Sequence, residues 1–86
     1  MPRQVSDIVT ELDWLLKEKI RFEGGDPVVT IPWRDFYLLC RMTRFKPPRD
    51  SEIRDQGRDR FGLIIAYGEK VVLVAHDRNF AEFTRD

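Results

Sequence analysis

The chain has 86 residues, with 15 basic and 15 acidic side chains and a formal net charge of zero at pH 7. This length suits one small domain, so we expect residues 1–86 to fold as a single unit. The balanced charge excludes a field over the whole molecule that would attract nucleic acid or anionic lipid, and any such attraction must therefore be local.

Cysteine content and hydropathy exclude several classes of protein. Cys40 is the only cysteine, which excludes an intramolecular disulfide and a cysteine-cluster zinc site and suits a reducing compartment. No apolar stretch approaches the ~18 residues of a membrane-spanning helix, and the N-terminus lacks a secretory signal pattern. We expect a soluble, cytoplasmic protein with no membrane partner.

The first predicted element is an amphipathic helix from Ser6 to Phe22. Gly24-Gly25 follows it as a helix stop. Apolar residues recur at steps of three and four, which predicts one buried stripe. The stripe consists of Val5, Ile8, Val9, Leu12, Leu15, Leu16 and Ile20.

A short strand and a second helix come next. Val28–Ile31 is rich in β-branched residues, which favours a strand, and Pro32 suits the start of a helix. Apolar residues at helical spacing predict that this second helix extends over Trp33–Arg44. Pro47-Pro48 must then stop it.

Residues 46–60 are strongly charged, and two interpretations remain open. A third helix over Ser51–Arg60 would begin at a cap on Asp50 or Ser51 and turn Ile53 inward. Alternatively the segment is a solvated connection, because one buried aliphatic residue does not offset the entropy of ordering the whole segment.

The hairpin Leu63–Val74 is the clearest element. Gly68-Glu69 predicts a two-residue turn with Tyr67 opposite Lys70. Strand alternation then makes both faces apolar, so we expect the second face to be covered by a partner chain or by a C-terminal turn. The two faces are Leu63, Ile65, Val72 and Val74 on one side and Ile64, Ala66, Val71, Leu73 and Ala75 on the other, and the C-terminal turn carries Phe80 and Phe83.

The predicted order α-β-α-α-β-β, with a C-terminal hairpin, resembles the winged helix-turn-helix superfamily, and its La motif in particular. The resemblance implies an α+β, winged-helix-like fold in which Val28–Ile31 is the first strand, Trp33–Arg44 the second helix, Ser51–Arg60 the recognition helix and the hairpin the wing. The same elements also fit a small α+β domain with a three-stranded antiparallel sheet and no helix-turn-helix geometry.

The resemblance further implies a DNA-binding or RNA-binding module that presents the third helix to a groove. Local charge is compatible with this, because residues 27–60 contain eight basic and five acidic side chains. We predict a basic strip within residues 41–60, with the wing tip beside it. The candidate residues are Arg44, Lys46, Arg49, Arg54, Arg58 and Lys70. The alternative is that these arginines pair with neighbouring carboxylates on a solvated face.

Trp14 suggests a second function, protein binding. On a helical wheel it lies opposite the apolar stripe, among charged residues that include Glu11 and Glu18. Exposed tryptophans are enriched among interface hot spots. We therefore keep a protein-interaction module as the alternative, and we expect a homodimer formed through the apolar hairpin.

Signals for catalysis are weak. His76 precedes Asp77, but adjacent strand residues point to opposite faces, and no nucleophile with an oxyanion pocket is evident. We interpret His76 as a structural histidine and Cys40 as a core residue. The sequence predicts no enzyme, no cofactor, no metal and no small-molecule substrate.

Overall fold

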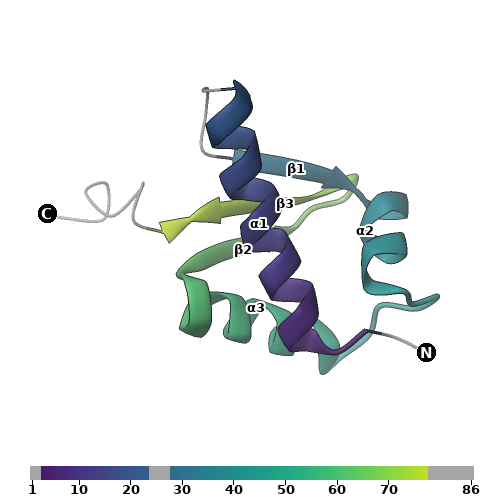
Figure 1. The fold of residues 1–86 in the computed structure, drawn as a ribbon. Coiled ribbons are helices and arrows are strands. Elements are labelled where there is room, and N and C mark those ends of the chain that lie inside the picture. The colour runs from purple at the N-terminus through teal and green to yellow at the C-terminus, as the bar shows by residue number, and fades with distance from the viewer. Residues whose placement is uncertain (1–2, 24–27, 78–86) are drawn as a thin grey trace, which may run out of the picture.

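The computed structural model describes residues 3–23 and 28–77, which form three helices and one three-stranded antiparallel sheet. The sheet order is β1-β3-β2, and Figure 1 shows α1 crossing one face of the sheet, with α3 alongside β2 and α2 at the end of β1. The fold class is α+β. In chain order the elements are α1 (Val5–Glu23), β1 (Val28–Pro32), α2 (Trp33–Cys40), α3 (Arg49–Phe61), β2 (Leu63–Tyr67) and β3 (Val71–His76).

The charged segment is a helix, which decides between the two interpretations of residues 46–60. Ile53 is fully buried in α3 and Gly57 is buried beside it. The helix ends at Gly62, whose φ of 67° is the left-handed conformation that glycine adopts readily. Packing on both α1 and β2 supplies the stabilisation that the local sequence lacks.

The second helix is shorter than predicted. It ends at Cys40, because Arg41 adopts a left-handed φ of 54° and the Met42 N–H donates to the Tyr37 carbonyl at 3.2 Å. In a continued helix Phe45 would face away from Phe36, nine residues earlier. The early end lets Phe45 fold back onto Phe36, with ring centroids 5.7 Å apart. Residues 41–48 form a loop between α2 and α3.

The turn of the hairpin differs from the prediction, although its faces do not. Tyr67 pairs with Val72 instead of Lys70, and the Gly68 N–H donates to the Val71 carbonyl at 2.9 Å. The register of the two strands is therefore shifted by two residues, and a shift of two leaves every side chain on its predicted face. A Cβ at Gly68 would lie 2.9 Å from the Val71 carbonyl oxygen, so this close approach favours glycine.

One face of the sheet carries the core and the other is apolar but only partly covered. The first predicted set, which includes Leu63 and Val74, is buried under α1 and α3. On the outer face Ala75 is buried, whereas Ile64 and Leu73 are half-buried. The proposed cover, Phe80 and Phe83, lies outside the described residues, and the hairpin dimer stays a prediction.

Gly57 allows α3 to approach β2 closely. A Cβ at this position would lie 3.0 Å from Ile65 Cδ1 and 3.4 Å from Leu63 Cβ. We expect Gly57→Val to lower the free energy of unfolding by about 2 kcal/mol in urea titrations, because the larger side chain must displace the strand. Gly57→Ala is the matched control. Its gain in helix propensity of about 0.5–1 kcal/mol should offset the tight contact, and equal stability of the valine variant would contradict this packing argument.

Candidate nucleic-acid interface

The five basic residues predicted within residues 41–60 divide between two places. Arg44, Lys46 and Arg49 line one open groove of about 580 Å³. Arg54 and Arg58 line a separate depression of about 230 Å³ beside β2. The strip expected over residues 41–60 is therefore not continuous.

The exposed side of α3 is electrostatically neutral. The helix carries four arginines and four carboxylates, and Arg58 pairs with Asp55 at 3.3 Å and Asp59 at 3.5 Å. Asp55 lies two residues from both buried positions, Ile53 and Gly57, so helical geometry directs it outward. Arg58 therefore behaves as the alternative interpretation predicts, because it pairs with neighbouring carboxylates on a solvated face. The outermost position of the helix is occupied by an acid, Asp55.

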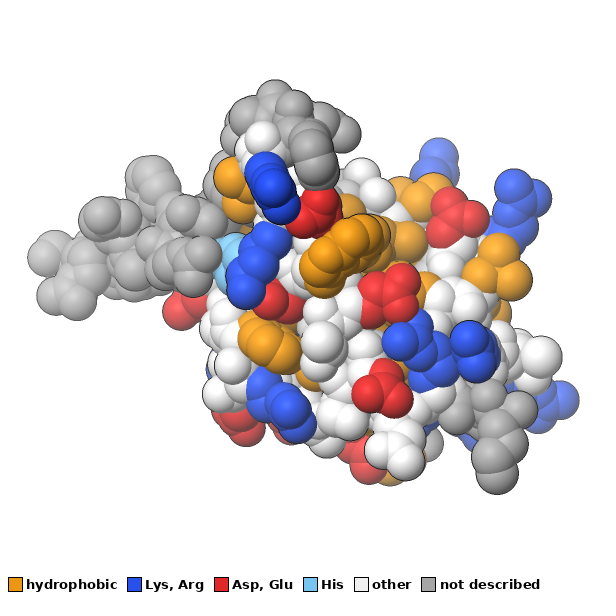
Figure 2. Space-filling view, viewed as in Figure 1, with side chains coloured by type: hydrophobic (Ala, Val, Ile, Leu, Met, Phe, Trp, Pro, Cys, Tyr) orange, Lys and Arg blue, Asp and Glu red, His pale blue; other side chains and the backbone are white. Residues whose placement is uncertain are grey.

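The second helix and the loop after it carry the local basic surplus. Arg34, Arg41, Arg44 and Lys46 are exposed, and none of them has an ion-pair partner among residues 3–23 and 28–77. Asp35 is the only acid in residues 33–48. Several Lys and Arg side chains project from the α2 side, at the right of Figure 2. We call Arg34, Arg41, Arg44, Lys46 and Arg49 the basic α2 surface.

This surface has an apolar centre. Leu38 is 71 % exposed, and with Tyr37, Arg34 and Arg41 it lines a second open groove of about 420 Å³. Met42 lines both this groove and the 580 Å³ groove, so the two adjoin. Cations thus surround accessible apolar and aromatic groups.

The hairpin tip lies next to the start of α2. The Trp33 indole Nε1–H donates to the Gly68 carbonyl at 2.7 Å, and Figure 1 shows the tip reaching the first turn of α2. Lys70 is exposed at this tip, beside the exposed Glu69. The wing residue therefore neighbours α2, whereas the resemblance had placed the wing beside the third helix.

Three arginines that line these grooves were not among the residues predicted from the sequence. Arg34 and Arg41 flank Leu38 at spacings of four and three, a pattern that shares one exposed helical face and could have identified them. Arg3 had no such signal. It is positioned by tertiary contacts, since its side chain pairs with Glu11 and donates to the Leu39 carbonyl at 3.1 Å. Pairing with Glu11 raises the pKa of Arg3.

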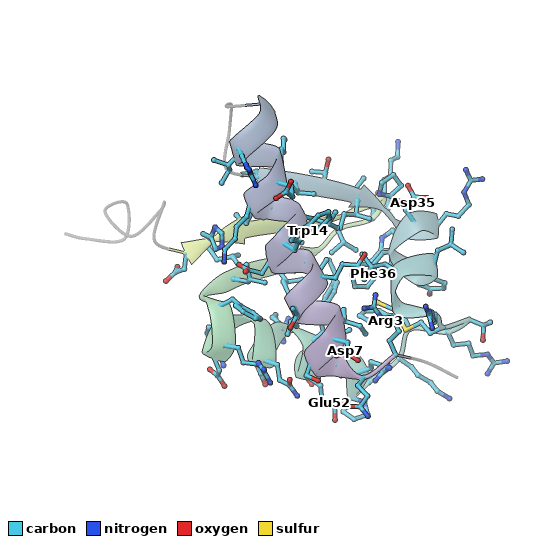
Figure 3. All side chains as sticks on the ribbon, in the orientation of Figure 1. Arg3, Asp7, Trp14, Asp35, Phe36 and Glu52 are labelled. Atoms are coloured by element: carbon cyan, nitrogen blue, oxygen red, sulfur yellow. The ribbon has the colours of Figure 1, made fainter. Side chains whose placement is uncertain are left out.

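Trp14 lies where the helical wheel predicts. It is 56 % exposed on α1, and Figure 3 shows it on the side of α1 that faces away from the sheet. A shallow groove of about 310 Å³ beside it is lined by Asp7, Thr10 and Glu11. Glu18 pairs with Arg21 at 3.8 Å. Binding of a partner through Trp14, Glu11 and Glu18 stays a prediction.

His76 is buried, but its partner is Asp13 of α1 and not the adjacent Asp77. The His76 Nε2 lies 2.9 Å from Asp13 Oδ1, and Lys17 Nζ lies 2.9 Å from Asp13 Oδ2. Burial alone would raise the pKa of Asp13, but the hydrogen bonds from His76 and Lys17 and their charges outweigh it and lower that pKa. Asp77 is exposed. The buried pair ties the last strand to the first helix.

The remaining chemical candidates do not form a site. Cys40 is buried, and burial raises the pKa of its thiol to about 11, which keeps it protonated and unreactive at neutral pH. Within residues 3–23 and 28–77, no cluster of three histidine, cysteine or acidic side chains is arranged to hold a metal ion. In the same part of the chain, no helix combines the length and apolarity needed to cross a bilayer.

Comparison of the chain with protein families, with curated proteins and with solved structures gives no match.

Proposed function

We propose that this domain binds the phosphodiester backbone of nucleic acid through the basic α2 surface and catalyses no reaction. The observation that carries the proposal is the group of exposed cations from Arg34 to Lys46, which have no ion-pair partners among the described residues and only one acid, Asp35, within residues 33–48. A cation that is already ion-paired, such as Arg58, neutralises little phosphate charge and so displaces few counterions from nucleic acid. An unpaired cation displaces more. This surface is therefore the part of the described chain best suited to phosphate.

The residue types on the surface also suit the ligand. The planar guanidinium groups of Arg41 and Arg44 can hold a phosphate through two donors each. Leu38 and Tyr37 offer apolar and aromatic area at the centre of the cationic ring. An aromatic ring can stack on an unpaired base, so single strands are included among the expected ligands.

The winged-helix resemblance supports a nucleic-acid ligand. We do not adopt the recognition helix that it implies, which is α3. The element order and the terminal hairpin agree with that architecture. However, α2 makes its main contacts with β1 and β3, and the loop 41–48 separates it from α3. We therefore propose contact through α2, its loop and Arg49 at the first position of α3, and not through the neutral exposed side of α3.

Two matched double variants test this placement. We expect Arg44→Gln/Lys46→Gln to reduce the slope of log K against log salt by about 1.8 for duplex DNA and about 1.4 for single strands, as the loss of two phosphate contacts requires. The control, Arg54→Gln/Arg58→Gln on α3, removes the same charge and should leave the slope unchanged. Titrations of fluorescent duplex and single-stranded DNA and RNA at several salt concentrations provide the measurement.

Each outcome of these titrations has a distinct meaning. A slope that falls only in the α3 variant would return the interface to the predicted recognition helix. If wild type shows no binding below ~100 µM at low salt, the nucleic-acid proposal is wrong, and the protein-interaction alternative takes its place. Thermal melts of all variants should agree within about 0.5 kcal/mol, because every substituted side chain is exposed.

A further inference from the structure

The exposed face of α1 has a symmetric pattern of charge about Trp14. Asp7 and Glu11 precede Trp14 by seven and three residues, and Lys17 and Arg21 follow it by three and seven. Spacings of three and seven keep all five side chains on one helical face. The face is therefore acidic in its first half and aromatic at its centre, and its second half carries two cations, Lys17 and Arg21, with one acid, Glu18.

Two copies of this helix face have complementary charges when the helices lie antiparallel. If a second copy of α1 lies antiparallel with its own Trp14 at the centre, Asp7 faces Arg21 of the partner subunit. Glu11 then faces Lys17 of the partner subunit, and the two-fold axis repeats both pairs. A parallel arrangement would instead place Asp7 against Asp7 and Lys17 against Lys17. The charges thus favour the antiparallel arrangement.

We propose that two copies of this chain associate through antiparallel packing of α1 about a two-fold axis at Trp14. The proposal does not depend on nucleic-acid binding, because it uses a different helix. The side chain at the centre is 56 % exposed, and Figures 2 and 3 show no described part of the chain in front of α1. Glu18, the remaining acid on this face, lies opposite the uncharged Thr10 of the partner subunit.

The ion pairs already present on this face are compatible with association. Glu11 pairs with Arg3, Lys17 with Asp13 at 2.9 Å, and Arg21 with Glu18 at 3.8 Å. Most of these side chains remain accessible, with Lys17 60 % and Arg21 73 % exposed, so the partner's charges can join them in networks. Such exposed pairs set orientation, whereas stacking of the two indole rings supplies most of the attraction.

The interface is expected to be small. One helix of 19 residues spans about 28 Å, and contact along a single helix face falls in the class of weak interfaces below ~1,200 Å². We therefore expect a reversible dimer whose population rises with concentration across the range ~10 µM to ~1 mM. Sedimentation velocity of wild type over this range provides the first measurement.

Two reciprocal charge variants test the antiparallel register. Asp7→Arg alone and Arg21→Asp alone each place like charges together at both ends of the homodimer, and we expect at least tenfold weaker dimerisation for each. In an equimolar mixture the two chains are complementary again, so the mixture should dimerise as wild type does. Recovery on mixing also requires that both variants are folded, which circular dichroism verifies independently.

Trp14→Ala tests whether the Trp14 side chain holds the proposed dimer together. We expect the dimer to be lost while the melting temperature at low concentration stays within about 2 °C of wild type. Leu38→Ala on α2 removes a side chain that is more exposed, 71 %, and should leave the dimer intact. The proposal is overturned by a wild-type chain that stays monomeric up to ~1 mM, by a dimer that survives Trp14→Ala, or by a mixture that stays monomeric.

Discussion

Replacing Phe36 by alanine is expected to lower the free energy of unfolding by about 3–5 kcal/mol, the largest effect of any single truncation considered for this domain. Phe36 has no exposed surface and packs edge-on against three rings. The ring centroids lie 5.7 Å from Trp33, 5.7 Å from Phe45 and 6.3 Å from Tyr67. Truncation would leave a cavity at the centre of this aromatic cluster.

The same substitution should also weaken the basic α2 surface. Only Phe36 and Cys40 are buried within this eight-residue helix, so docking of α2 depends heavily on the Phe36 ring. Urea titration followed by circular dichroism measures the loss. Phe36→Leu is the control and should cost about 1–1.5 kcal/mol, since it conserves much of the volume. A cost below about 1 kcal/mol for the alanine variant would show that the cluster does not support α2.

Replacing Asp13 by alanine is the second large expected effect, a loss of about 2–4 kcal/mol at pH 7. The substitution leaves His76 Nε2 buried without its acceptor and removes the carboxylate that Lys17 contacts. A buried polar group deprived of its partner bears its full desolvation cost. Asp7→Ala, an exposed acid on the same helix, is the control and should cost under about 1 kcal/mol.

The effect of Asp13 should also depend on pH. Because folding lowers the pKa of Asp13 from its ordinary value of 3.8, its contribution to stability is complete above that value and is lost as the pH falls through the folded pKa. The difference in unfolding free energy between wild type and Asp13→Ala should therefore shrink below about pH 4. A difference that stays constant between pH 7 and pH 3 would contradict the hydrogen-bonded, ionised carboxylate.

Local patterns in the sequence were sufficient for most element boundaries and for the exposure of Trp14. Apolar spacing predicted the first helix to within one residue at each end, and strand alternation predicted which hairpin side chains share a face. These predictions succeed because the periods of helix and strand depend on backbone geometry alone. The position of Trp14 follows from the same geometry.

The candidate site was only partly predictable. Arg44, Lys46 and Arg49 do line one groove, but Arg54 and Arg58 belong to another, and Arg34 and Arg41 were not selected. The net charge of a segment does not reveal which cations are already paired. That depends on which carboxylate each side chain can reach in the folded chain.

The sequence by itself determined the α+β class, the order of the first helix, the first strand, the second helix and the hairpin, and the amphipathic faces, because these follow from local periodicity. Only the tertiary structure decided the rest. Packing against α1 and β2 stabilises α3 as a helix. Gly57 allows β2 to approach α3 closely, although a glycine by itself lowers helix stability. The left-handed conformation of Arg41 ended α2 at Cys40, and this end lets Phe45 pack on Phe36. Contacts between distant residues, such as Asp13 and His76, carry no local signal, because their energy depends on burial and distance in the folded chain.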